Sequence, residues 1–290
     1  MFSDNFPLRH LSIIGVGLIG GSLARALRRA GFRGTITGCG RSEESLHRAV
    51  ELGVIDRYAL DPQEAVRGAD GVVLAVPVLS LRAVLEAIAP ALSRGCILTD
   101  VGSTKQSVVD AARAVFGTLP ASFIPGHPIA GTERNGVDAS FAELYDGRLV
   151  ILTPEPESDP AAVATVRSLW QAAGAEVVEM TAQHHDEVLA ETSHLPHLLA
   201  YALVDNLARK QESREIFRFA AGGFRDFTRI ASSDPQMWRD ICLANRDALL
   251  DALRSYQNDL ATLGEALARA DDDYLLQTFR RAKQARDERT

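Results

Sequence analysis

The feature that most constrains the fold is a glycine-rich loop near the N-terminus. The segment GVGLIG, residues 15–20, directly follows a β-branched run and opens a helical pattern. In this context Gly15 permits a tight turn, Gly17 lets a pyrophosphate approach the backbone, and Gly20 lets the helix pack against the sheet. The alternative is a packing turn without a ligand. We predict a dinucleotide site that includes Gly15, Gly17, Leu18, Ile19, Gly20 and, at the end of a later apolar run, Val76.

Short apolar runs alternate with helical patterns through the first part of the chain. The run 71–76 is continuously apolar and stops at Pro77, which is typical of a strand buried on both faces of a parallel sheet. The alternation predicts an α/β fold with an N-terminal Rossmann-like, doubly wound sheet. We expect strands at 11–14, 35–39, 71–76, 97–100, 123–124, 149–152 and 175–180, and helices at 19–30, 43–52 and 161–172.

The strand signals stop after Thr181, and the rest of the chain has helical patterns. We therefore predict a dinucleotide-binding domain over 1–181 and an all-helical second domain over 182–290, to which the resemblance described below assigns substrate binding and dimerisation. Apolar residues that recur mostly every three or four positions predict one stripe, suited to a core or a dimer interface. These residues are Trp238, Ile241, Leu249, Leu253, Tyr256, Leu260, Leu263 and Leu267.

Composition excludes several classes of protein. The 290 residues include 31 basic and 38 acidic side chains, and the net charge of −7 disfavours nucleic-acid binding. No apolar run reaches the roughly 18 residues that a membrane span needs, and no signal peptide is visible. Three cysteines, an odd number, argue against a disulfide framework and for a reducing cytoplasm.

The end of the second predicted strand indicates which cofactor is used. An NAD site usually has an acidic residue there to hold the ribose hydroxyls. Here the strand is followed by Gly40, Arg41 and Ser42, and Glu43 comes too late in the sequence. Arg41 can pair with a 2′-phosphate and Ser42 can hydrogen bond to it. We predict NADP, with NAD possible if Arg41 is only a solvated surface charge.

Four further segments concentrate reactive and charged residues. Asp100–Lys105 and Gly126–Glu133 each follow a predicted strand, and Glu191–His197 and Gly222–Arg229 lie in the helical part. Ligands bind outside the carboxyl ends of the strands in open α/β sheets. The first two segments are therefore expected at the edge where a nicotinamide ring would lie.

At these residues the sequence resembles the prephenate/arogenate dehydrogenase family of tyrosine biosynthesis. The resemblance rests on GVGLIGGS, DVGSTK, HPIAGTE, SHLPH and GFRDFTRIASSDPQMWRDI in this order, and it runs from Leu11 to about Arg246. It implies oxidation and decarboxylation of prephenate, arogenate or both, and a homodimer built through the C-terminal helices. The segment from Gly40 to Ser42 departs from the family members that use NAD.

The resemblance also implies residue roles. His127 matches a catalytic histidine that accepts the proton of the ring 4-hydroxyl while hydride leaves C4, and Ser103 matches a serine near that hydroxyl and the nicotinamide. Arg229 matches an arginine that binds a substrate carboxylate, and Asp226 a nearby aspartate that organises the pocket. The other substrate-pocket positions are Ser193, His197 and, at the edge of the active site, Glu133.

Several of these residues also fit other roles. His194 and His197 share a helix face, but without an evident acidic partner we expect no metal site, and His194 is expected to pack or to orient a neighbour. His184 and His185 are expected at a solvated helix start. A reductase of the β-hydroxyacid dehydrogenase or imine reductase type would need a helical lysine, for which Lys210 lacks context. A non-catalytic NADPH-binding protein would need neither His127 nor Arg229.

Overall fold

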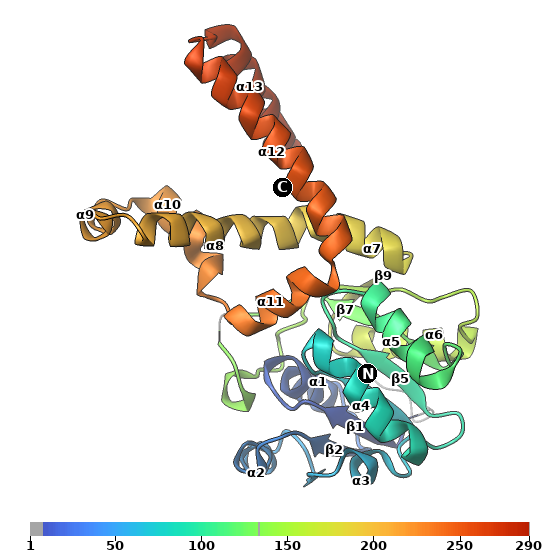
Figure 1. The fold of residues 1–290 in the computed structure, drawn as a ribbon. Coiled ribbons are helices and arrows are strands. Elements are labelled where there is room, and N and C mark those ends of the chain that lie inside the picture. Colours follow the sequence, from blue (N-terminus) through green and yellow to red (C-terminus); the bar gives the residue numbers. More distant parts are fainter. Residues whose placement is uncertain (1–7, 133, 290) are drawn as a thin grey trace. The chain divides into compact units, whose positions relative to one another are not determined.

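The chain divides into two compact units, Met1–Asn245 and Arg246–Thr290. The computed structural model describes residues 8–132 and 134–289. The first unit is built on a six-stranded parallel sheet with the order β3-β2-β1-β4-β5-β6 (Figure 1). Its strands are β1 (His10–Ile14), β2 (Thr35–Cys39), β3 (Arg57–Ala59), β4 (Gly71–Leu74), β5 (Ile97–Asp100) and β6 (Phe123–Ile124). The strand order reverses between β1 and β4, which confirms the predicted doubly wound α/β class.

Helices cover both faces of this sheet. The helices α1 (Leu18–Arg29), α2 (Glu43–Glu51) and α6 (Pro160–Ala172) contribute to one buried apolar cluster. The helices α3 (Pro62–Val66), α4 (Leu81–Ile88) and α5 (Gln106–Phe116) contribute to the other. Both faces of β4 are buried, as its continuous apolar sequence predicted.

The predicted series of strands is divided between two sheets, which corrects the expectation of one. A second, three-stranded sheet contains β7 (Gly126–Pro128), β8 (Leu149–Leu152) and β9 (Glu176–Glu179), with β7 antiparallel to β8. Pro125 separates β6 from β7. Because proline has no N–H group to donate, the ladder with β5 ends there and the chain passes into the second sheet.

A run of helices completes the first unit. They are α7 (Ala182–Leu189), α8 (Leu195–Ala208), α9 (Ser213–Arg218), α10 (Gly222–Thr228) and α11 (Pro235–Ala244). A π-helical turn, Ala190–His194, joins α7 to α8. It lies just before Pro196, which cannot donate the backbone hydrogen bond of a regular α-helix. Short 3-10 turns lie at Val78–Ser80, Ala89–Ala91, Val137–Ala139 and Arg229–Ser232.

The second unit is a helical hairpin of α12 (Arg246–Ala268) and α13 (Asp272–Arg289), which turns at Ala270 with φ 52°. The predicted apolar stripe is not continuous, because Asn245 separates α11 from α12. Trp238 and Ile241 therefore belong to the first unit and Leu249 to Leu267 to the second. None of the helices in the described part of the chain is long and apolar enough to cross a membrane.

Candidate active site

The glycine loop lies between β1 and α1, at the carboxyl edge of the sheet. Gly15 has φ 102°, and a Cβ there would lie 2.2 Å from the Ala75 carbonyl oxygen. A Cβ on Gly20 would lie 2.3 Å from the Gly15 carbonyl oxygen, so neither position tolerates a side chain. Gly17 begins α1 without a side-chain cap, and the space around its missing Cβ is open. The loop thus offers helix N–H groups to an anion, which fits a dinucleotide pyrophosphate.

Three further predicted cofactor positions lie in this segment or after β4. Leu18 is buried in the first turn of α1, and the carbonyl oxygen of the half-buried Ile19 accepts a hydrogen bond from Tyr145. Val76 is half-buried, two residues after β4 ends. Leu18 and Ile19 pack into the apolar cluster that includes α1, whereas Val76 packs against the cluster on the other face of the sheet.

The loop after β2 has exposed polar side chains. Arg41 and Ser42 are both exposed, and the Ser42 hydroxyl accepts a hydrogen bond from the backbone N–H of Ser45, 3.2 Å away, at the start of α2. Glu43 lies in the first turn of α2, where it accepts a hydrogen bond from the Tyr58 hydroxyl. The strand end therefore presents a guanidinium and a hydroxyl rather than a carboxylate.

The segment Asp100–Lys105 is organised by a buried ion pair. Lys105 Nζ lies 2.5 Å from Asp100 Oδ2, and both side chains are fully buried. Lys105 Nζ also donates to the carbonyl oxygen of Gly126, and Asp100 accepts from the backbone N–H groups of Gly102 and Gly126. This pair fixes the backbone on either side of Ser103 and directly before His127.

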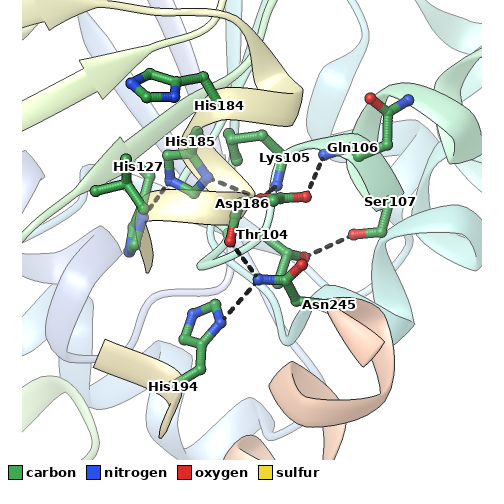
Figure 2. A network of polar contacts seen from close by, with 12 residues as sticks. Thr104, Lys105, Gln106, Ser107, His127, His184, His185, Asp186, His194 and Asn245 are labelled. Atoms are coloured by element: carbon green, nitrogen blue, oxygen red, sulfur yellow. Dashed lines mark hydrogen bonds and ion pairs between the residues drawn. The ribbon is translucent and has the colours of Figure 1, made fainter. Parts of the chain in front are cut away.

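A chain of hydrogen bonds runs from His127 to α7 (Figure 2). His127 Nδ1 lies 2.8 Å from His185 Nε2, and His185 Nδ1 lies 2.8 Å from Asp186 Oδ1. The Asp186 carboxylate also accepts from the backbone N–H groups of Lys105 and Gln106 at the start of α5, at 2.7 and 2.9 Å. We call His127, His185 and Asp186 the histidine relay.

His185 corrects the expectation of a solvated pair of histidines at the start of α7. His184 is exposed and points away from the network in Figure 2, whereas the side chain of His185 is fully buried. Neighbouring residues of a helix point about 100° apart, so only one of the two could face the sheet. The local sequence does not show which of the two is buried, because the partner of His185, His127, is 58 residues away.

Asn245 links the relay to His194. Its side-chain amide donates to the carbonyl oxygen of Asp186, at 2.8 Å, and lies 3.0 Å from His194 Nδ1. His194 is buried, and its Nε2 has no hydrogen-bond partner among the described residues. Burial lowers the pKa of His194 to about 4, although Asp186 and the backbone of Ser103 act in the opposite direction. The half-buried Ser103 thus lies beside His194.

Burial also favours the neutral form of the two relay histidines. Burial lowers the pKa of His127 well below its usual value of 6.5, and His185, Lys105 and His194 add to this effect. Burial also lowers the pKa of His185, but there the Asp186 carboxylate opposes it. A neutral imidazole can accept a proton, so His127 has the protonation state that a general base requires.

The predicted substrate residues lie on α8, on α10 and in the helical turns beside them, and they partly come together. His197 Nδ1 donates to the carbonyl oxygen of Ser193 at 2.8 Å, and the His197 ring stacks on Trp238 with centroids 3.5 Å apart. Burial lowers the pKa of His197, and the nearby positive charge of Arg229 lowers it further. Asp226 is exposed on α10. Glu133 lies outside the described residues.

Sequence reasoning missed four members of this network: Lys105 as a buried charge, His185, Asp186 and Asn245. Lys105 and Asp186 are buried charged residues, a class that sequence patterns rarely identify. The alternation of polar and apolar residues in a single sequence does not show which polar residues pair inside the protein. Among the described residues, no cluster of three or more His, Cys, Asp or Glu could hold a metal ion.

Comparison with known proteins identifies the family of the chain. Two protein-family models match the chain, "Prephenate dehydrogenase, nucleotide-binding domain" over residues 23–179 and "Prephenate dehydrogenase, dimerization domain" over 181–281. A cyclohexadienyl dehydrogenase from Zymomonas mobilis is 44% identical over 281 residues, which cover 96% of this chain and 95% of that protein.

Solved structures are also similar. Prephenate dehydrogenase from A. aeolicus, in complex with hydroxyphenyl propionate and NAD+, has 38% identity and a TM-score of 0.90, with 97% of this chain and 98% of that chain covered. Arogenate dehydrogenase from Synechocystis has 29% identity and a TM-score of 0.82, with 97% and 100% covered.

The parallel sheet, the glycine loop at its edge and the matched nucleotide-binding domain define an oxidoreductase with a nicotinamide cofactor. More particularly, the chain belongs to the prephenate dehydrogenase family.

Proposed function

We propose that the protein oxidises and decarboxylates prephenate to 4-hydroxyphenylpyruvate, with NADP as the hydride acceptor and arogenate as an alternative substrate. In this reaction the C4–H bond gives up a hydride and the 4-hydroxyl gives up a proton. The bond from C1 to its carboxylate then breaks, carbon dioxide leaves, and the electron pair makes the ring aromatic. The protein must therefore supply a base, hold a doubly charged substrate and position a cofactor.

The observation that carries the proposal is the environment of His127. Its ring is buried and neutral, its Nδ1 is hydrogen bonded to His185, and its Nε2 has no hydrogen-bond partner within the described part of the chain. We propose that Nε2 accepts the proton of the substrate 4-hydroxyl. Ser103, in the segment that the Lys105–Asp100 pair fixes, is proposed to bind the same hydroxyl.

Substrate binding is proposed for the surface around His197. Arg229 acts on His197 electrostatically, and a guanidinium is well suited to binding a carboxylate through two hydrogen bonds. We propose that Arg229 binds one substrate carboxylate and that the other pocket positions orient the rest of the molecule. Those positions are Ser193, His197, Asp226 and Glu133.

The glycine loop is proposed to hold the cofactor pyrophosphate, and Arg41 and Ser42 the 2′-phosphate of NADP. The bound cofactor would supply the hydride acceptor. Ser42 uses an oxygen lone pair to cap α2, so its hydroxyl hydrogen is still free to donate to a phosphate. The similar A. aeolicus enzyme contains NAD+ in its structure, so NAD is the competing proposal.

The choice between substrates follows the names of the relatives. They include a cyclohexadienyl dehydrogenase, a prephenate dehydrogenase and an arogenate dehydrogenase. We propose prephenate first and a dual-substrate enzyme second, acting in the cytoplasm. We also propose Thr181 as the boundary between the nucleotide-binding and dimerisation domains, because the two family models meet there.

The test is the initial rate of NADPH formation from prephenate and NADP, followed by the absorbance of the reduced nicotinamide. A clear rate is expected, and parallel assays with arogenate and NAD rank the alternatives. If none of the four combinations gives a rate although NADPH binds, the chain is a non-catalytic NADPH-binding protein.

A homodimer is the proposed assembly, with the C-terminal helices at its interface, because the matched domain at 181–281 is described as a dimerization domain. Light scattering at micromolar protein should give twice the chain mass of 31.4 kDa. A monomer at that concentration contradicts the proposed assembly and leaves the proposed chemistry standing.

A further inference from the structure

We propose that His185 and Asp186 are positioning residues that lock His127 in one tautomer, with the proton on Nδ1 and the lone pair on Nε2. This inference rests on the proposed function, since it concerns how the proposed base is prepared. It follows from a chain of donors and acceptors that begins at the backbone of α5.

The first step concerns Asp186. Its Oδ1 and Oδ2 accept from the backbone N–H groups of Lys105 and Gln106, and a backbone N–H group can only donate. Both oxygens therefore already act as acceptors at the positive end of a helix, which favours a carboxylate. His185 Nδ1, 2.8 Å from Oδ1, must then be the donor of their shared hydrogen bond.

The second step extends this donor–acceptor order to His127. A neutral imidazole has one N–H donor and one acceptor nitrogen. Since His185 uses Nδ1 as the donor, its Nε2 is the acceptor, and His127 Nδ1 must supply the hydrogen across the 2.8 Å contact. The remaining lone pair of His127 is then on Nε2. With the opposite tautomer, two lone pairs would face each other between the rings and the base would carry a proton where it must accept one.

The relay is rigid because each member is held by another part of the fold. Asp186 is held by the start of α5, and His185 is fully enclosed on α7. His127 lies in β7, where its backbone pairs with Ile151 and the preceding carbonyl accepts from Lys105 Nζ. These contacts join three elements at one point, so the imidazole of His127 is oriented before any substrate arrives.

The relay also accommodates the charge that forms when His127 takes a proton. The groups that act on His127 are His185, Lys105 and His194, and all three oppose its protonation. The groups that act on His185 are Lys105, Asp186 and Asp100, and the two carboxylates favour its protonation. His185, by contrast, contacts the Asp186 carboxylate. The Nδ1–H bond of a protonated His127 points at this neutral acceptor, and Asp186 supplies the counter-charge one ring further on.

The test compares His185→Leu with His184→Leu, its exposed neighbour on the same helix. We expect His185→Leu to lower kcat about 10²- to 10⁴-fold, the range for loss of a correctly prepared general base, with KM nearly unchanged. His184→Leu should leave kcat within about twofold. Because a leucine in the enclosed site could impair folding, His185→Gln is the second variant. Its side-chain oxygen can accept from His127 Nδ1, so it should recover most of the lost kcat.

A spectroscopic measurement tests the tautomer without turnover. In protein labelled with ¹⁵N-histidine, the nitrogen shifts of His127 should show a protonated Nδ1 and an unprotonated Nε2, and His185→Leu should abolish this preference. A wild-type His127 with its proton on Nε2 overturns the inference, as does a His185→Leu variant that loses activity while the tautomer stays the same. Should prephenate and arogenate both fail as substrates, the proposed function falls and the nitrogen shifts still decide the relay.

Discussion

The two proposed functional regions of this protein differ in how they are built. The histidine relay is buried, and each member is held by a neighbour from a different element of the fold. The loop after β2, with Arg41 and Ser42, is exposed and depends on one short segment of sequence. The proposed chemistry thus depends on buried residues that are not proposed to touch the substrate, whereas the proposed cofactor choice depends on side chains that would contact the ligand directly.

Loss of the proposed base should have the largest effect. His127→Asn removes the Nε2 lone pair and should lower kcat by about 10²- to 10⁴-fold. NADPH affinity should stay within about twofold, because the glycine loop is separate from β7. Steady-state kinetics and fluorescence titration of NADPH measure the two quantities. Equal loss of both would contradict the assignment of His127.

Breaking the buried ion pair should mainly affect stability. Lys105→Met leaves the Asp100 carboxylate buried without a counter-ion, which typically costs about 3–5 kcal/mol. The matched control is Arg82→Met, which removes an exposed pair with Glu86 and should cost at most about 1 kcal/mol. Urea unfolding measures both. A small cost for Lys105→Met would show that the enclosed region is less tightly coupled than the contacts imply.

Acid should lower the free energy of unfolding through the buried His194. The pKa of His194 is about 4 in the folded protein, against 6.5 for an ordinary histidine, so the unfolded chain binds more protons between these values. Stability conferred by the neutral His194 is therefore complete above pH 6.5 and is lost as the pH falls toward 4. The difference corresponds to at most about 3 kcal/mol.

The variant pair His194→Asn and His184→Asn checks this dependence. Unfolding free energies between pH 7 and 4.5 should fall less steeply for His194→Asn than for the wild type. His184 is exposed, so His184→Asn should follow the wild-type curve. Parallel curves for all three proteins would remove His194 as a source of the acid sensitivity.

Changing the exposed loop should have the smallest effect. Arg41→Ala should weaken NADP binding about tenfold, roughly 1.4 kcal/mol, and leave NAD binding nearly unchanged. The control Arg82→Ala removes another exposed arginine and should not alter the NADP/NAD ratio. An unchanged ratio for Arg41→Ala would end the proposed 2′-phosphate contact.

The fold was largely predictable because its signals are local. A strand, a glycine turn and a helix follow one another within residues 10–29, and the continuous apolar run that forms β4 is the mark of a buried strand. The second sheet was missed because its strands have the same local pattern as the first. Only the pairing partner of each strand distinguishes the two sheets. Pro125 lies at the change of sheet, but a proline alone does not predict such a change.

The site was predictable only in part, because many of its contacts join residues that are far apart in the sequence. The position of His127 after a predicted strand placed it at the edge of the sheet, and the resemblance to a family supplied its role. The members that orient it, His185 and Asp186, are identified by contacts across 58 and 81 residues of sequence. Such contacts depend on which side of α7 faces the sheet, and a single residue separates the buried His185 from the exposed His184.

The π-helical turn between α7 and α8 changes the direction in which the side chains of α8 point relative to those of α7. Such a turn holds one residue more than a regular turn, so it acts as a one-residue insertion. Asp186 and His194 are eight residues apart. At about 100° per residue, their directions around the axis of a regular helix would differ by about 80°. With the one-residue insertion, the two directions differ by only about 20°. Asn245 can therefore contact both residues. Deleting Thr192 would therefore rotate His194 and His197 away from the relay while leaving every side chain of the site in the sequence.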